Sequence, residues 1–258
     1  MKKLALSTVA AVALLGSAQA DAAPTIEFTL LQAAWYDATG GQSIVYVPGE
    51  NTLGASVQVS WGTPFPGLSE DPSSYVFDAR DVPFTEDPDQ QFDLGEFTHN
   101  NFPIASGGGI DSVNLRLVGN LTVTNSDNTV DVVNGITFLY FFDHWETPNG
   151  ADPCADGGPN GVGVNEFGCA DQVVITPLLN TGIFTVDGEQ FTLAIDGFRL
   201  HSSNELVNEF WTVENAANVA TLVGRFTTEI PVPEPGTLAL LGIGLLGAGV
   251  AARKRQAA

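Results

Sequence analysis

The chain has 258 residues, of which 44% are hydrophobic, so it is long enough to bury a sizeable core. Its formal net charge is −21, and residues 21–230 hold 29 acidic side chains against four arginines and no lysine. A surface this negative repels phosphate backbones, so nucleic acid is excluded as a partner.

The first 20 residues have the composition of a secretory signal peptide. They consist of a basic start, an apolar run and an A-x-A cleavage site: Lys2-Lys3, residues 4–15 and Ala18-Gln19-Ala20. We expect cleavage before Asp21 and exclude this segment from the fold. Residues 21–230 are then expected to form one acidic domain, followed by a sorting tail over residues 231–258.

Within the domain, short β-branched or aromatic runs recur between Gly, Pro, Asn and Asp residues. The predicted strands are residues 25–34, 43–47, 55–61, 74–77, 112–124, 136–142, 172–175, 182–186, 190–195, 210–213 and 219–228. Asp187-Gly188 is a hairpin signal, and residues 78–91 are expected to be an exposed loop before strand-like sequence resumes at Phe92. No part of the domain keeps a helical period for three turns, which predicts an all-β, antiparallel β-sandwich with a jelly-roll-like topology.

The most distinctive internal string is Thr98-His99-Asn100-Asn101. Thr98, His99 and Asn101 place short polar groups beside aromatic residues and a proline, where such side chains usually tie a turn to a neighbouring strand. The alternative joins His99, His144 and Glu146 in a metal site, because imidazole and carboxylate are suitable zinc ligands. Structural bracing is the preferred interpretation, since the protein has three histidines and none forms a ligand-spaced pair.

Cys154 and Cys169 are the only cysteines, and an even, local pair in an exported protein indicates a disulfide. Closing the loop between them would stabilise the fold by about 3 kcal/mol in the chain-entropy model. Oxygen ligands gather around this loop and suit calcium, although their spacing does not match an EF-hand. The candidate calcium ligands are Glu146, Asn149, Asp152 and Asp156. No other cofactor is expected.

The chain has no G-x-S-x-G elbow, H-E-x-x-H motif or P-loop, and no cysteine free to act as a nucleophile. We therefore expect no catalytic residues and no enzyme activity. The tryptophans are suited either to packing in a sandwich core or to stacking on sugars, and core packing is preferred. They are Trp35, Trp61, Trp145 and Trp211, of which Trp145 is expected to be the most exposed.

The tail has three parts in a fixed order. They are a V-P-E-P string, an uncharged run and a basic cluster: Val232, Pro233, Glu234, Pro235; residues 236–252; and Arg253, Lys254, Arg255. A helix over the 17 uncharged residues would span roughly 25 Å, close to the bilayer core of about 30 Å. The basic cluster favours the cytoplasmic side. We expect membrane insertion, at least transiently, with the domain outside.

This order resembles the PEP-CTERM sorting signal of Gram-negative bacteria. The resemblance implies recognition by an exosortase, a membrane-embedded transpeptidase-like enzyme, with removal of the helix. Residues 98–101 match the T-H-x-N signature of the THxN family of PEP-CTERM proteins, and Glu146-Thr147-Pro148-Asn149 resembles an E-T-P-N segment found there and in choice-of-anchor surface domains. That family has no established biochemical activity.

The resemblance implies a protein that crosses the inner membrane, is held there transiently and reaches the cell surface or the extracellular matrix. A structural or adhesive role in the envelope or the biofilm matrix follows as an expectation, with exopolysaccharide as a partner. The alternative function is that of a carbohydrate-binding module assisted by calcium.

Overall fold

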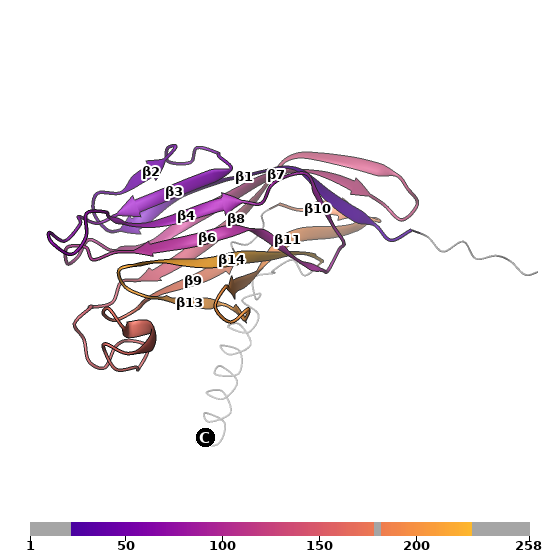
Figure 1. Cartoon of the computed structure of the whole chain (residues 1–258). Helices are drawn as coiled ribbons and strands as arrows, with labels where there is room; N and C mark the ends of the chain where they lie inside the picture. Colours follow the sequence, from indigo (N-terminus) through magenta and orange to yellow (C-terminus); the bar gives the residue numbers. More distant parts are fainter. Residues whose placement is uncertain (1–21, 178–181, 229–258) are drawn as a thin grey trace, which may run out of the picture.

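The computed structural model describes residues 22–177 and 182–228, which form two curled antiparallel sheets packed as a sandwich (Figure 1). The six-stranded sheet consists, in spatial order, of β13 (Glu209–Thr212), β9 (Asp171–Pro177), β8 (Val130–Trp145), β7 (Ile110–Thr124), β1 (Thr25–Gly40) and β5 (Phe84–Glu86). The eight-stranded sheet consists of β10 (Phe184–Val186), β11 (Glu189–Leu200), β14 (Ala216–Thr227), β6 (Gln91–Asn101), β4 (Ser73–Ala79), β3 (Ser56–Trp61) and β2 (Val45–Val47), with β12 (Leu206–Val207) paired to β11. The predicted all-β antiparallel sandwich is therefore confirmed.

The connections are of two kinds. β2–β3–β4 and β7–β8–β9 are meanders within one sheet, whereas most other connections cross between the sheets. A jelly roll is built from Greek keys, in which connections cross between the sheets. The crossing connections seen here fit the expected jelly-roll-like order, and the two meanders do not. The predicted hairpin turn is confirmed, because Asp187 and Gly188 both have positive φ, 50° and 83°, between the paired strands β10 and β11.

Alternation of side chains along the strands places the core between the sheets. In β7, Val113, Leu115 and Leu117 are fully buried, and the residues between them are partly exposed. Aromatic rings join the two layers: Phe97 of β6 stacks on Phe142 of β8 with centroids 5.5 Å apart. The core therefore depends on contacts between strands that are distant in sequence.

Each of the eleven predicted strands overlaps a strand of the structure, and β6 begins at Gln91, next to the expected restart at Phe92. The exposed loop expected over residues 78–91 is wrong in part. β4 runs to Ala79, and β5 lies within the segment and pairs with β1. Phe84 of β5 is 7% exposed because its ring packs against Phe28, 4.9 Å away.

The signal-peptide prediction over residues 1–20 and the sorting-tail prediction over residues 231–258 lie outside the described residues. Across residues 22–177 and 182–228, no helix has both the length and the apolar character needed to cross a membrane.

Candidate functional site

One end of the sandwich core is polar. His99 of β6, His144 of β8 and Asp171 of β9 are buried there, with exposed fractions of 0%, 6% and 0%. Tyr75 of β4 and Thr212 of β13 contact the two imidazoles, and we call these five residues the polar centre. The two sheets contribute jointly to it, because β4 and β6 belong to one sheet and the other three strands to the other.

The strand pleat explains why these side chains point inward. Asp171 pairs with Thr212 at the start of β9, and His144 pairs with Val173, the next inward-facing residue of β9. Successive side chains of a strand point to opposite faces, so the residues between these positions lie on the outer surface. The same register therefore produces a buried polar group and an exposed row at one sheet end.

The Thr212 hydroxyl fixes the tautomer of His99. Thr212 Oγ1 lies 3.1 Å from the backbone carbonyl of Asp171, which only accepts, so the hydroxyl donates its one proton there. His99 Nδ1, 2.9 Å from the same Oγ1, must then donate its N–H to the hydroxyl. Burial and the neighbouring His144 hold the pKa of His99 well below its usual value, so the ring is neutral. Its Nε2 is a bare lone pair without a hydrogen-bond partner among the described residues.

Two neighbours hold the second imidazole. Tyr75 Oη lies 2.6 Å from His144 Nδ1, and Glu146 Oε2 lies 3.3 Å from His144 Nε2. Burial, and then the carboxylate of Asp171, raise the pKa of Tyr75 well above its ordinary value, so the phenol keeps its proton. Contacts on both ring nitrogens fix the orientation of His144, as outer partners do for metal-binding histidines.

Three acidic side chains, those of Glu146, Asp171 and Glu214, interact around the imidazoles. Asp171 Oδ1 accepts a hydrogen bond from Thr147 N at 2.6 Å, but Oδ2 has no partner among the described residues. Burial, and then the Glu146 carboxylate, raise the pKa of Asp171 well above its usual value and that of Glu214 to about 7. The site therefore concentrates carboxylates that are poorly compensated by the protein itself.

The T-H-x-N and E-T-P-N segments meet at the polar centre. His99 points into it, and Asn101 Nδ2 donates to the backbone carbonyl of Thr212 at 3.2 Å. This is a side-chain to backbone hydrogen bond of the predicted kind, but it joins β6 to β13 in the other sheet. The residues lie in β6 rather than in the expected turn, because β6 extends to Asn101. Thr98 is half-buried, and the pleat turns it to the opposite face of β6 from His99.

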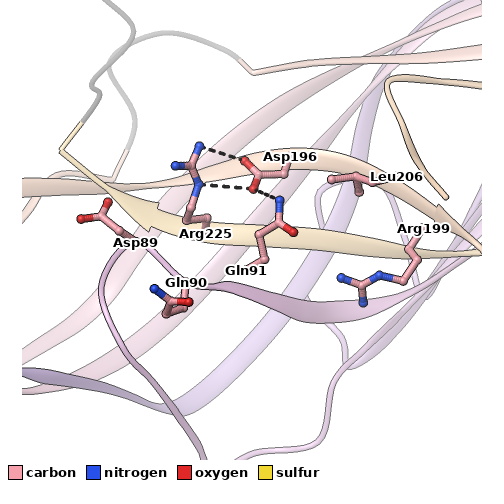
Figure 2. A pocket seen from close by; sticks show the side chains of 7 residues that line it. All are labelled: Asp89, Gln90, Gln91, Asp196, Arg199, Leu206 and Arg225. Atoms are coloured by element: carbon pink, nitrogen blue, oxygen red, sulfur yellow. Dashed lines mark hydrogen bonds and ion pairs between the residues drawn. The ribbon is translucent and has the colours of Figure 1, made fainter. Parts of the chain in front are cut away.

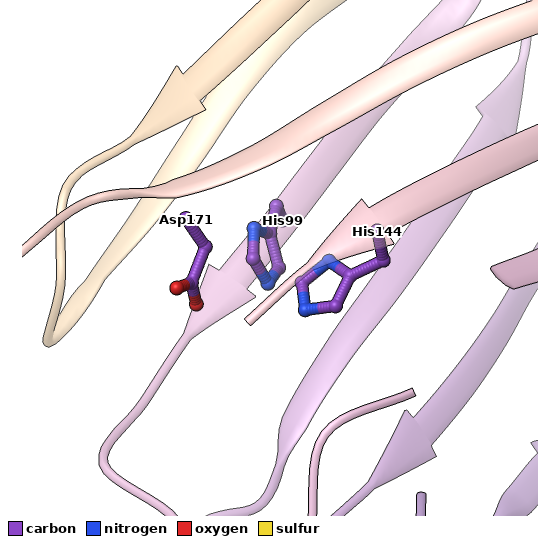
Figure 3. A group of neighbouring side chains, drawn as sticks. All are labelled: His99, His144 and Asp171. Atoms are coloured by element: carbon purple, nitrogen blue, oxygen red, sulfur yellow. The ribbon is translucent and has the colours of Figure 1, made fainter. Parts of the chain in front are cut away.

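Figure 3 shows the two imidazoles beside the Asp171 carboxylate. Among residues 22–177 and 182–228, this is the one group of three or more His, Cys, Asp or Glu side chains whose ligand atoms all lie within 4.8 Å of one another. The zinc hypothesis from the sequence joined His99, His144 and Glu146. The structure brings the imidazoles to 5.3 Å between ring centroids, keeps Glu146 beside His144 and adds Asp171. Two imidazoles and a carboxylate are donors that a transition metal ion accepts.

The candidate calcium ligands are not gathered in this way. Among the described residues, Glu146, Asp152 and Asp156 do not form a group of three carboxylates at that spacing. Both carboxylate oxygens of Asp156 accept hydrogen bonds from Asn165 Nδ2 at 3.0 Å. The backbone carbonyl of Asn149 accepts one from Asn160 Nδ2 at 2.8 Å. Calcium binding here stays a prediction, which calorimetry with millimolar calcium tests.

The predicted disulfide between Cys154 and Cys169 is present, and both residues are buried. Its loop is tied to the polar centre through Thr147, whose N–H donates to Asp171 and whose Oγ1 donates to the carbonyls of Ala170 at 3.0 Å and Cys169 at 3.3 Å. Asn165 adds a second tie, since its Oδ1 accepts from Ala170 N at 2.7 Å. The loop therefore covers this end of the sandwich.

The sequence offered no signal for two members of the site, Thr212 and Glu214. They flank the end of a four-residue strand, β13, that is more than 100 residues from His99. A buried Thr or Glu at a strand end has no characteristic spacing, so only the fold reveals its neighbours. The nearest available signal was the run of two bulky residues, Phe210 and Trp211, before them.

The outer face of the six-stranded sheet carries an aromatic row at the same end. Trp145, Gln172 and Trp211 are paired across β8, β9 and β13, and the two indole rings are 6.3 Å apart. Trp145 is 52% exposed, as predicted, whereas Trp35 and Trp61 are buried in the core. The row thus offers one exposed ring, that of Trp145, and the half-buried ring of Trp211, with an amide between them.

A polar depression on the eight-stranded sheet is poorly suited to binding charged ligands, because its arginines are already paired. Figure 2 shows Arg225 facing Asp196, with Gln91 on the same carboxylate; the ion pair is 3.3 Å and the hydrogen bond 2.7 Å long. Arg199, on its rim, is paired with Asp93. Both arginines are thus neutralised, so the depression has no free cation to attract an anion.

A groove of about 450 Å³ lies next to the polar centre. Phe65 and Leu68, both strongly exposed, form one part of its lining, and residues 146–149 form another. Glu146 therefore reaches from this groove to His144, and it gives the buried histidine a route to solvent.

A family model, the PEP-CTERM protein-sorting motif, matches residues 231–256. The match contains the predicted V-P-E-P string and the basic cluster at residues 253–255. The chain therefore carries a sorting motif that indicates an exported protein handled by an exosortase. No curated protein matches the chain, and the THxN and choice-of-anchor resemblances stay predictions.

Proposed function

We propose that this protein is a structural or adhesive component of the cell surface or the biofilm matrix. The sorting motif at residues 231–256 is the observation that carries the proposal, because it indicates an exported protein that an exosortase processes. The covalently closed loop at residues 154–169 suits an oxidising compartment outside the cytoplasm. Residues 21–230 carry 29 acidic side chains against four arginines. This negative charge keeps copies of the domain soluble and separate until they meet a partner.

Mass spectrometry of the protein isolated from its own host tests delivery. We expect an N-terminus at Asp21 and loss of the apolar run at residues 236–252. In a strain without exosortase the same run should remain attached. An untrimmed polypeptide in the cytosol, with Cys154 and Cys169 reduced, would overturn the proposal.

A deletion strain tests the structural role. Loss of the protein should weaken surface attachment or matrix cohesion, and the full-length gene should restore it. A gene that ends before Val232 supplies the matched control, because it exports the domain without the sorting motif. Unchanged attachment and cohesion in the deletion strain would argue against a structural or adhesive role.

Carbohydrate binding is the second candidate function, and the outward-facing row of Trp145, Gln172 and Trp211 favours it. Aromatic faces stack on sugar rings, and nearby polar groups orient the ring hydroxyls. Glu209 extends the row, since its carboxylate accepts hydrogen bonds from Gln172 Nε2 at 2.9 Å and Trp211 Nε1 at 3.3 Å.

Affinity electrophoresis in gels that contain the host's exopolysaccharide tests this function, with and without calcium. Retardation should be lost in Trp145→Ala and Trp211→Ala. Val132→Ala, which removes an apolar side chain that is 62% exposed on β8, is the control and should be retarded normally. Equal mobility of the wild type with and without polysaccharide would exclude this function for that polymer.

A further inference from the structure

The polar centre contains two buried ligand atoms that the protein leaves without partners. They are His99 Nε2 and Asp171 Oδ2, and both side chains are 0% exposed. A buried polar atom without a hydrogen bond destabilises a fold, so native structures rarely keep one without a partner. Two such atoms in one group, one of them a lone pair fixed by Thr212, indicate a missing partner that accepts electron pairs.

The arginines of the described chain do not supply that partner. Arg80, Arg199 and Arg225 are paired with Glu86, Asp93 and Asp196. Arg116 donates to the backbone carbonyl of Asn51. The acids around the imidazoles thus have no arginine partner among residues 22–177 and 182–228. The missing positive charge is therefore expected to come from solution.

We propose that His99, His144 and Asp171 bind one divalent transition metal ion, with zinc as the best match, which fastens the two sheets together. Two imidazole nitrogens and a carboxylate oxygen are zinc donors, whereas calcium prefers a shell of oxygens. The three ligands come from β6, β8 and β9, so one ion would join strands of both sheets. The burial of all three ligands assigns the ion a structural rather than a catalytic role.

The surrounding contacts match those of a metal site. Thr212 holds His99 by Nδ1 and leaves its Nε2 to the ion. His144 offers Nε2 to the ion in the tautomer whose Nδ1–H donates to the Tyr75 hydroxyl, 2.6 Å away. Glu146, 3.3 Å from His144 Nε2, is placed to complete the shell as a fourth ligand. With two neutral imidazoles, Asp171 and Glu146 balance the two positive charges of the ion.

The required movement is small. Ligand atoms around tetrahedral zinc lie about 3.3 Å apart, given metal–ligand distances near 2.0 Å. The three ligand atoms here already lie within 4.8 Å of one another, so side-chain rotations of roughly an ångström close the site. Glu146 lines the groove and contacts His144, so the groove is the side from which an ion would approach.

The test uses the mature exported protein, stripped with EDTA and then titrated with zinc. We expect one zinc per chain by elemental mass spectrometry and a higher melting temperature after loading. His144→Gln and Asp171→Asn should each weaken zinc binding more than about tenfold. His201→Gln is the matched control, because His201 is exposed and bonds only Thr221 Oγ1, at 3.0 Å, among the described residues; it should bind zinc as the wild type does.

Cobalt substitution in the unmutated protein gives a readout that does not depend on the folding of a variant. Co²⁺ in a four-coordinate site should produce intense visible absorption that zinc then removes. The proposal is overturned if the stripped protein neither takes up zinc nor gains thermal stability from it. It is also overturned if calcium stabilises the protein and zinc does not, or if His201→Gln abolishes zinc binding.

Discussion

The Tyr75 hydroxyl lies 2.6 Å from Nδ1 of His144 and so joins the two sheets of the sandwich through the core, across 69 residues of sequence. Tyr75→Phe removes this hydrogen bond and leaves a buried imidazole nitrogen without its partner. We expect a loss of about 1–3 kcal/mol in the free energy of unfolding. Urea denaturation followed by tryptophan fluorescence measures it.

Tyr36→Phe is the control for that experiment. The Tyr36 side chain is only half-buried, and its hydroxyl makes no hydrogen bond within residues 22–177 and 182–228, so the change should stay within about 0.5 kcal/mol. Equal losses in the two variants would show that the contact between Tyr75 and His144 contributes nothing specific.

The disulfide is the second element that stabilises this end of the fold. Replacing Cys154 and Cys169 by alanine together releases a loop of sequence separation 15. The chain-entropy model gives a loss of about 3 kcal/mol, and the tie between Thr147 and the Cys169 carbonyl should weaken with it. Thermal unfolding with and without reductant measures the effect. An unchanged melting temperature after full reduction would contradict it.

The sequence predicted those parts of the fold that repeat a local pattern. β7 shows strict alternation from Val113 to Thr124, and Asp187-Gly188 has the composition of a type I′ turn, so both were found. β5 and β12 were missed, because each is short and lies within polar, turn-rich sequence, whereas the equally short β10 is marked by the Asp187-Gly188 turn. Phe84 lies in a strand because it pairs with and packs against Phe28. Phe28 is 56 residues away in the sequence, so no local pattern reveals the pairing.

The candidate site was harder to predict for the same reason. His99 and His144 could be paired as a guess from residue type, but nothing local places them at 5.3 Å. In the sequence, nothing distinguishes Asp171 from the other acidic residues near the loop between Cys154 and Cys169. Its role follows from its pairing with Thr212, which fixes both side chains on the inner face. Sites built from four or five strands therefore remain hidden until the register is known.

Gly95 tests how closely the central strands approach. An added Cβ there would clash with the carbonyl oxygen of Asp78 on β4 and with the Phe77 ring. Because a backbone atom cannot move away cheaply, Gly95→Ala should destabilise the fold by about 1–3 kcal/mol. Gly150→Ala is the control, since nothing lies within 4 Å of its added Cβ. Denaturant midpoints compare the two variants, and equal midpoints would refute the close approach.

Stability at alkaline pH should depend on Tyr140, whose buried hydroxyl donates to the Leu193 carbonyl at 2.9 Å. Burial raises the pKa of Tyr140 well above its ordinary value of 10. Its contribution is fully present below pH 10 and is lost as the pH rises above 10, because only the unfolded chain then ionises. Tyr140→Phe should cost about 1 kcal/mol at pH 8 and show a shallower decline between pH 10 and 11. Urea titrations at each pH measure both slopes, and parallel declines would contradict the assignment.

The acidic surface gives a prediction about salt. Residues 21–230 carry 29 acids and four arginines, and three of these arginines are already in ion pairs. The remaining carboxylates repel one another more in the compact fold than in the extended chain, and added ions screen that repulsion. Raising NaCl from 20 to 200 mM, in EDTA so that metal binding does not contribute, should therefore raise the melting temperature by a few degrees. Sucrose at equal osmolality is the control, because it acts by exclusion from the surface and not by screening. A melting temperature that falls with NaCl would mean that the three arginine ion pairs, which salt weakens, stabilise the fold more than the repulsion among the acids destabilises it.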